Sequence, residues 1–309
     1  MSDPQSWERS TLEKIAMGAL EEQKRSRKWG ILFKALTFAY LFVLLFLAMD
    51  WIGPGSTAAG SHTALIDIRG VIGDEDAVNA DDTISSLQTA FEDKNTKGII
   101  LRINSPGGSP VQSGIINDEI HRLRKLNPKV PVYAVVEDLC ASGGYYIAVA
   151  ADKIYVDKAS IVGSIGVLMD GFGFTGTMQK LGVERRVMTA GENKAILDPF
   201  SPVNPTHQAH AQSMLNEVHR QFIDTVKLGR GSRLKESPDI FSGLFWSGET
   251  SIQLGLADGL GSVSSVARDV IKEENVVDFT VSEDFADRFA RRLGASMSSV
   301  LLNTGLKLH

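Results

Sequence analysis

Apolar residues are most concentrated near the N-terminus, in the stretch 31–52. Trp29 and Trp51 stand at its two ends, and Lys34 lies close enough to one end for its ammonium group to reach the membrane interface. About 20 helical residues cross a hydrocarbon core about 30 Å thick. The pattern therefore predicts one transmembrane helix.

The charges that flank this stretch are unequal. Basic residues precede it, namely Lys24, Arg25, Arg27 and Lys28, whereas residues 53–62 carry no formal charge. The positive-inside rule places the N-terminus in the cytoplasm and everything after residue 52 across the membrane. A cleaved signal peptide is an alternative, because residues 56–60 are small, and a buried core helix is another. We expect an uncleaved anchor, since the charged region before the stretch is longer than that of a signal peptide.

After residue 62, short β-branched runs alternate with helical patterns. The strand-like runs are 64–73, 97–104, 131–136 and 153–156. The helical patterns are 83–92, 111–126 and a stretch that opens at the Ser-Gly-Gly turn 142–144. Buried strands that alternate with helices predict an α/β fold with a largely parallel sheet.

The second half of the chain has a longer helical pattern over 205–227. Its apolar positions form one stripe, which we expect to be core: Ala209, Met214, Leu215, Val218, Phe222 and Val226. We also expect a strand over 184–190 and a helix over 263–274. The predicted organisation is a cytoplasmic stub 1–30, an anchor 31–52, a linker 53–62, a main domain 63–275 and a C-terminal extension 276–309.

Composition narrows the functional classes. The 309 residues hold 32 basic and 37 acidic side chains, for a formal net charge of -5, so we expect no binding of nucleic acid. Cys140 is the single cysteine, which excludes an intramolecular disulfide and a multi-cysteine metal site. His207 and His210 share a helix face without a third ligand nearby, and we expect neither a metal nor a cofactor.

Two glycine-rich turns carry the residues suited to chemistry. Serine hydrolysis needs an activated hydroxyl and backbone donors for the oxyanion. Ser142 opens a predicted helix, and the N–H of Gly143 directly follows it. The turn SPGG at 105–108 is a candidate for a second donor, because its glycines permit conformations that expose an N–H. Each turn, taken alone, is also compatible with a purely structural role.

The general base is harder to identify from pattern. None of the six histidines stands in a glycine-rich or strand-end context, as a triad histidine would. A lysine serves as a base when it is neutral, a state that burial favours. Lys194, in the segment TAGENKAILDPFSP, is the candidate. Cys140 is a weaker rival to Ser142 as the nucleophile, because a lone cysteine beside a helix start is usually packed in the core.

Several motifs in a fixed order resemble the signal peptide peptidase A family in its short, single-copy form. They are IRGVI, INSPGG, ASGGYYIA, VGSIGV, AGENKAILDPFSP and SGETSIQLGLADGLG, and the resemblance covers about 64–270. The family shares the Clp protease/crotonase-like fold. The resemblance therefore implies repeated strand–helix units with a parallel sheet, in addition to one N-terminal transmembrane helix.

The resemblance also implies roles for individual residues. Ser142 matches the nucleophile, Lys194 the general base and Ser164 the serine that positions the lysine, although Ser164 is equally compatible with a tight structural turn. Gly108 matches an oxyanion donor, alongside Gly143. Apolar residues near the site, which we expect to bind substrate, are Leu139, Ile161, Val162 and Leu168.

By this resemblance we expect a membrane-anchored serine endopeptidase that hydrolyses remnant signal peptides and other unfolded apolar peptides through an acyl-enzyme. We expect a single-pass protein of the bacterial inner membrane, with its catalytic domain periplasmic or otherwise extracytoplasmic. Its protomers would form a homo-oligomeric ring with shared active sites. The alternatives are a non-catalytic membrane scaffold, a peptide-binding member of the same fold, and a crotonase-type acyl-CoA enzyme, which would need neither Ser142 nor Lys194.

Overall fold

The computed structural model describes residues 4–51, 60–74, 76–235 and 237–281. The chain divides into two compact units, one of Met1–Thr57 with Asp284–His309 and one of Ala58–Glu283. Most of the expected linker, and the expected C-terminal extension beyond residue 281, lie outside the described residues. The second unit contains the sheet and the candidate site.

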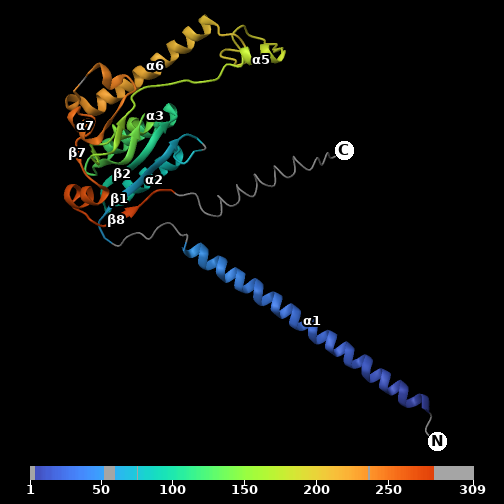
Figure 1. The fold of residues 1–309 in the computed structure, drawn as a ribbon. Helices are drawn as coiled ribbons and strands as arrows, with labels where there is room; N and C mark the ends of the chain where they lie inside the picture. The colour runs from blue at the N-terminus through green and yellow to red at the C-terminus, as the bar shows by residue number, and fades with distance from the viewer. Residues whose placement is uncertain (1–3, 52–59, 75, 236, 282–309) are drawn as a thin grey trace. The chain divides into compact units, whose positions relative to one another are not determined.

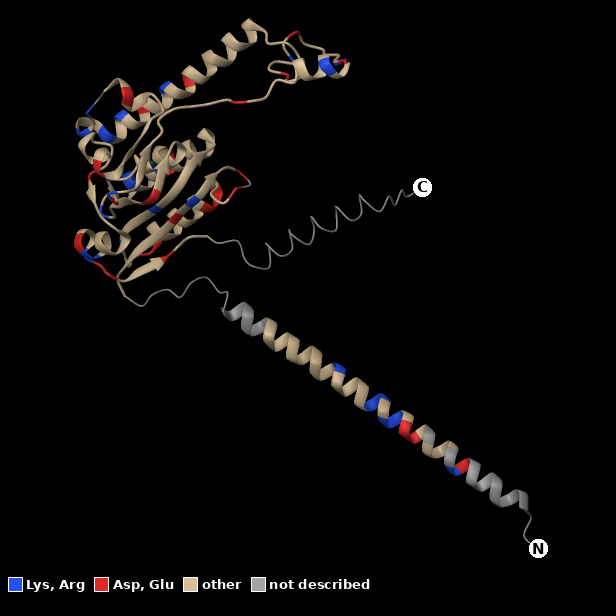
Figure 2. Cartoon of the chain, viewed as in Figure 1, with Lys and Arg blue, Asp and Glu red and all other residues tan. Residues whose placement is uncertain are grey.

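The first unit consists, in its described part, of the helix α1 (Pro4–Trp51). By length and composition its stretch Ala16–Leu45 is suited to cross a membrane, and among the described residues it is the one helix with that property. Figure 2 shows basic residues of α1 on the N-terminal side of the apolar residues 35–45. The large apolar side chains described there, from Trp29 to Leu45, are exposed. Such a surface needs an apolar environment.

The second unit is an α/β domain with an eight-stranded sheet. The strand order is β6-β5-β3-β2-β1-β8, and β4 pairs with both β3 and β7. Every pairing is parallel except that of β5 with β6. Figure 1 shows the strands of this sheet with α2 and α3 beside them. The sequence expectation of an α/β fold with a largely parallel sheet is confirmed.

The described elements have these bounds. The strands are β1 (His62–Ile72), β2 (Thr96–Gly108), β3 (Val132–Ala141), β4 (Lys153–Val156), β5 (Ile161–Gly163), β6 (Phe245–Ser247), β7 (Gly259–Leu260) and β8 (Val276–Asp278). The helices are α2 (Ala80–Glu92), α3 (Pro110–Leu126), α4 (Gly143–Ala148), α5 (Thr175–Leu181), α6 (Pro205–Arg230), η1 (Gly231–Arg233), η2 (Pro238–Phe241), α7 (Gly248–Gln253), α8 (Val263–Ser265) and η3 (Val266–Ile271).

The two faces of the sheet differ because successive side chains of a strand point to opposite sides. On one face, Ile66, Ile99 and Ala134 belong to the main core, together with residues of α2, α3 and α4. On the other face, a smaller cluster packs Leu65 and Ile100 against η3. That face then becomes charged towards the ends of the strands. The strands therefore carry their apolar residues where helices cover them.

An ion-pair network occupies the charged part of this face. Arg102 of β2 binds Asp67 of β1 through two nitrogens. Arg69 of β1 donates to the carboxylate of Glu137 of β3 at 2.8 Å. These pairs link the three central strands. The central strands end at the two glycine-rich turns.

Two local expectations are wrong. Residues 184–190 form no strand, since they are exposed and no neighbouring strand is available to pair with them. The apolar stripe of α6 is core only in part. Phe222 and Val226 are buried, whereas Ala209 and Met214 are exposed. The C-terminal half of α6 packs on the domain, and the N-terminal half extends past it (Figure 1).

Candidate active site

Ser142 lies between the end of β3 and the start of α4. Its backbone has φ 52° and ψ -121°, a conformation that costs a non-glycine residue about 1–3 kcal/mol. Two hydrogen bonds hold it there: the Ser142 N–H donates to the carbonyl of Gly163 at 2.9 Å, and the Ser142 carbonyl accepts from the N–H of Tyr146 at 3.0 Å. Its hydroxyl caps no helix and makes no hydrogen bond within the described part of the chain. The turn thus presents an unengaged hydroxyl to the cavity beside it.

Three glycines of the two turns have no space for a Cβ. A Cβ on Gly107 would lie 2.6 Å from the Cβ of Ser142, and one on Gly108 would lie 2.0 Å from the carbonyl oxygen of Ile72. A Cβ on Gly143 would lie 2.4 Å from the Ser113 hydroxyl and 3.3 Å from the amide nitrogen of Gly108. Only hydrogen atoms fit in these gaps. The close contact brings the expected oxyanion donors, Gly108 and Gly143, together beside Ser142.

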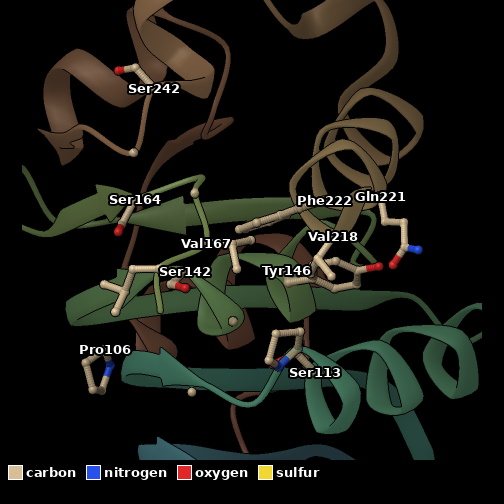
Figure 3. A pocket seen from close by; sticks show the side chains of 16 residues that line it. Pro106, Ser113, Ser142, Tyr146, Ser164, Val167, Val218, Gln221, Phe222 and Ser242 are labelled. Carbon is tan, nitrogen blue, oxygen red and sulfur yellow. The ribbon is translucent and has the colours of Figure 1, made fainter. Parts of the chain in front are cut away.

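These residues open onto a cavity of about 610 Å³. Ser142, Ser164, Gly108 and Gly143 all line it, so the structure brings four of the expected site residues into one place. Figure 3 shows the two serines at one end of the cavity and side chains of α6 at the other. No histidine is among the described residues that line it.

Ser164 stands directly after β5 and also has a left-handed backbone, with φ 53°. Its N–H donates to the carbonyl of Leu244 at 2.7 Å, which ties this turn to the residue before β6. Gly163, just before it, accepts the hydrogen bond from Ser142. Ser164 therefore belongs to the same rigid frame as Ser142, with its own turn fixed by the sheet.

Lys194 lies away from this cavity. It is exposed, and it belongs to a turn in which its N–H donates to the carbonyl of Gly191 at 3.1 Å. The turn is part of residues 168–204, here named the arm, which includes α5. Figure 1 shows α5 beyond the N-terminal end of α6, away from the sheet. A single chain therefore does not bring Lys194 to Ser142.

The tip of the arm has a fold of its own. Phe174 and Phe200 stack with their ring centroids 5.4 Å apart, and Arg185 lies over Phe200 at 5.5 Å. The N–H of Phe174 donates to the carbonyl of Pro199 at 2.7 Å. Hydrogen bonds from Ser201 and the Phe200 backbone, with the charge of Arg185, hold the pKa of Asp198 below its usual value. The arm therefore presents Lys194 on a folded element.

The residues expected to bind substrate fall in different places. Leu168 lines the cavity at the start of the arm and is 79% exposed. Leu139 and Ile161 are register partners on β3 and β5, and Val162 is fully buried in the core. None of these three lines the cavity.

Sequence reasoning missed the wall that α6 and α4 provide. Val218, Gln221 and Phe222 of α6 and Tyr146 of α4 line the cavity. The rings of Tyr146 and Phe222 are 5.0 Å apart, and the Thr225 hydroxyl donates to the Tyr146 hydroxyl at 2.9 Å. The helical spacing of Val218 and Phe222 was visible in the sequence. It does not distinguish a cavity wall from core.

Cys140 and the histidines have other surroundings. Cys140 is fully buried, and burial raises the pKa of its thiol, which disfavours the nucleophilic thiolate. His207 has its Nε2 3.0 Å from the Oδ1 of Asn193, so it contacts the arm. Among the described residues, no group of three or more His, Cys, Asp or Glu side chains is arranged to hold a metal ion.

Comparisons with known proteins identify a peptidase family. The model of peptidase family S49 matches residues 124–277. A Na(+)/H(+) antiporter NhaA from Brucella abortus is 49% identical over 186 residues, which are 60% of this chain and 25% of that protein. The chain thus spans about a quarter of the length of this relative.

Two further relatives are matched over more of their length. A putative signal peptide peptidase SppA from Enterococcus faecium is 28% identical over 73% of this chain and 67% of that protein. A putative protease from Synechocystis sp. is 32% identical over 69% of this chain and 74% of that protein. The resemblance to signal peptide peptidase A is confirmed, and the chain belongs to peptidase family S49.

Proposed function

We propose that the protein is a membrane-anchored serine endopeptidase with a serine/lysine dyad. The observation that carries the proposal is the strained Ser142, whose hydroxyl is unengaged within the described residues beside the amides of Gly108 and Gly143. In the proposed reaction, the Ser142 oxygen attacks a peptide carbonyl and passes its proton to Lys194. The two amides stabilise the oxyanion, and Lys194 returns the proton to the nitrogen of the leaving amine. Lys194 then takes a proton from the water that attacks the acyl-enzyme and returns it to the Ser142 oxygen as the acid is released.

The separation of Lys194 from the cavity supports a shared active site. A lysine accepts a proton from serine only as the free amine, a state that burial favours. Lys194 is exposed in one chain, so the proposal requires a second copy to cover it. Large apolar side chains of the arm are also exposed, including Phe172 at 79% and Met188 at 97%. We propose a ring in which each arm delivers Lys194 to the cavity of a neighbour.

The cavity suits unfolded apolar peptides. Val167, Leu168, Val218 and Phe222 give it an apolar wall, whereas Ser142 and Ser164 lie together at one end and the amide of Gln221 lies at the other. Such a wall favours apolar side chains of the substrate over charged ones. Remnant signal peptides are peptides of this kind, and we propose them as the substrate class. No cofactor takes part in the proposed reaction.

The proposed anchor is the apolar part of α1. The basic residues of α1 that precede residue 31, coloured in Figure 2, support a cytoplasmic N-terminus under the positive-inside rule. The peptidase domain then lies on the periplasmic or extracytoplasmic face of a bacterial inner membrane. Peptides released into the membrane would reach the cavity from that side.

The test compares the full-length protein in detergent with single variants, using a fluorogenic apolar peptide. We expect Ser142→Ala and Lys194→Ala to be inactive, and Lys180→Ala, a matched change in the arm, to retain activity. An acylating serine probe is expected to label the wild type and not Ser142→Ala. Co-expression of the two inactive variants should restore about a quarter of the activity, since random neighbours then complete that share of sites.

The second candidate is a non-catalytic scaffold that binds peptides, favoured by the separation of Lys194 from Ser142 within one chain. It predicts a wild type that assembles and binds the peptide but neither hydrolyses it nor reacts with the probe. If Lys194→Ala hydrolysed the peptide and Ser142→Ala did not, the protein would still be a serine peptidase, but Lys194 would not be its base. Failure of co-expression to restore activity would reject the shared site.

A further inference from the structure

The strand that leads to the candidate oxyanion turn contains an irregularity. In the pairing of β1 with β2, Arg69 faces Asn104, and the next pair is Val71 with Gly107. One residue of β1, Gly70, therefore faces two residues of β2, Ser105 and Pro106. This is a β-bulge, and Pro106 has no N–H to donate to Gly70. A side chain must replace the missing backbone donor.

The hydroxyl of Ser105 fills that role. Ser105 is fully buried, and its Oγ donates to the carbonyl oxygen of Gly70 at 2.6 Å. The same Oγ accepts from the N–H of Gly107 at 3.1 Å. One hydroxyl thus joins β1 to the glycine turn and uses the N–H of Gly107.

This bond affects the next amide. Gly107 and Gly108 have φ 99° and 152°, so the chain leaves the ordinary strand conformation here and its course depends on the bonds that hold it. The bond to Ser105 fixes the N–H of Gly107, and the next nitrogen, that of Gly108, lies 3.3 Å from the Cβ position of Gly143. Ser105 also lies beneath the nucleophile turn, because a Cβ on Gly144 would be 3.2 Å from the Cβ of Ser105.

We propose that Ser105 is a positioning residue for the oxyanion hole. Its two hydrogen bonds hold the bulge in the conformation that orients the N–H of Gly108. The proposal rests on the proposed peptidase function. Ser105 touches neither the substrate nor the reacting atoms. Ser105 fixes the position of the Gly108 donor, which binds the transition state more tightly than the ground state. Loss of the Ser105 hydroxyl should therefore lower kcat and leave KM nearly unchanged.

The test compares Ser105→Ala with Ser86→Ala in the full-length protein. Ser86 is a matched control on α2: it is 1% exposed, and its hydroxyl donates to the Asp82 carbonyl at 2.8 Å and accepts from the Val281 N–H at 2.9 Å. We expect Ser105→Ala to lower kcat about 10- to 100-fold, less than the loss of a whole oxyanion donor. Affinity for a peptide aldehyde, which forms a tetrahedral adduct, should fall by the same factor. Ser86→Ala should change neither.

Hydrogen exchange gives a readout independent of activity: the Gly107 amide should exchange faster in Ser105→Ala than in the wild type. A Ser105→Ala protein with kcat within about twofold of the wild type would overturn the proposal. So would an equal fall of kcat in Ser86→Ala, because the effect would then follow general destabilisation. An assembled wild type that neither hydrolyses peptide nor reacts with the serine probe overturns the peptidase function itself, and this proposal with it.

Discussion

The candidate site depends on residues whose backbone conformation and close contacts leave no space for a larger side chain. Ser142 holds a strained backbone, and the hydrogen bonds to Gly163 and from Tyr146 oppose its relaxation. Gly107 faces it at a distance that admits no Cβ. Strain and close packing coincide where the chemistry is proposed, as is common at active sites.

A methyl group at Gly107 tests this packing. Gly107 has φ 99°, and its Cβ would meet Ser142 at 2.6 Å and the Gly143 nitrogen at 2.7 Å. We expect Gly107→Ala to lower the free energy of unfolding by about 2–4 kcal/mol and hydrolysis by at least about 100-fold. Urea unfolding and peptide hydrolysis measure the two effects.

Gly114→Ala is the matched control. Gly114 lies within α3, and a Cβ there would have no atom within 4 Å. Alanine should therefore stabilise the helix by up to about 1 kcal/mol and leave hydrolysis unchanged. If Gly107→Ala behaved like Gly114→Ala, the close approach of the two turns would be disproved.

At the scale of elements, an ion pair fixes α6 to the domain. The buried Arg230 in the last turn of α6 binds both carboxylate oxygens of Asp258, at 2.8 and 3.0 Å. Burial raises the pKa of Asp258, but the hydrogen bonds from Arg230 and the Ile154 N–H outweigh it and hold the pKa below its usual value. The cavity wall of α6 thus depends on an anchor at its C-terminal end.

The depressed pKa predicts how stability changes with pH. The unfolded carboxyl has a pKa of about 3.9, and the folded one is lower, so the pair's contribution is complete above about pH 4 and is lost as pH falls through the folded value. We expect Asp258→Asn to cost about 3 kcal/mol at pH 7, because it leaves the buried guanidinium without its counter-charge. The free energy of unfolding of Asp258→Asn should also fall less between pH 7 and acidic pH than that of the wild type. Urea unfolding at a series of pH values measures both.

Asp269→Asn provides the control for this change. Asp269 pairs with Arg268 at 2.9 Å, but both side chains are more than half exposed. The variant should change the free energy of unfolding by less than about 1 kcal/mol. Equal effects of the two substitutions at pH 7 would show that the Arg230 pair does not anchor α6.

The elements differ in how well the sequence predicted them. The strands and helices around Ser142 were predictable, because short β-branched runs between helical patterns indicate a buried parallel sheet and the glycine-rich turns mark its ends. The arm was not, because Val187 and Met188 read as a strand although no partner strand is available. The stripe of α6 marked apolar positions correctly. It did not indicate that only its C-terminal half has a domain to pack on.

At the scale of the whole molecule, the proposed dyad requires a second copy, because Lys194 lies away from Ser142 within one chain. The frame of Ser142, Ser164 and the two amides is predictable from local motifs and forms within one chain. The position of Lys194 depends on the direction of the arm. The order of the motifs along the sequence does not indicate whether the arm folds back onto its own domain or extends away from it. The exposed apolar surface of the arm is the physical reason to expect a second copy.

Met188, 97% exposed on the arm, tests that expectation. If a neighbour covers it, Met188→Lys should remove about 1.5–3 kcal/mol of apolar burial and raise the protomer concentration at half-assembly by about 10- to 100-fold. Sedimentation velocity of the detergent-solubilised protein measures the assembly, and peptide hydrolysis should fall with it. Leu126→Lys, at an exposed site on α3, should leave both unchanged. A Met188→Lys protein that assembles and hydrolyses peptide like the wild type would show that the arm reaches no neighbour through this residue.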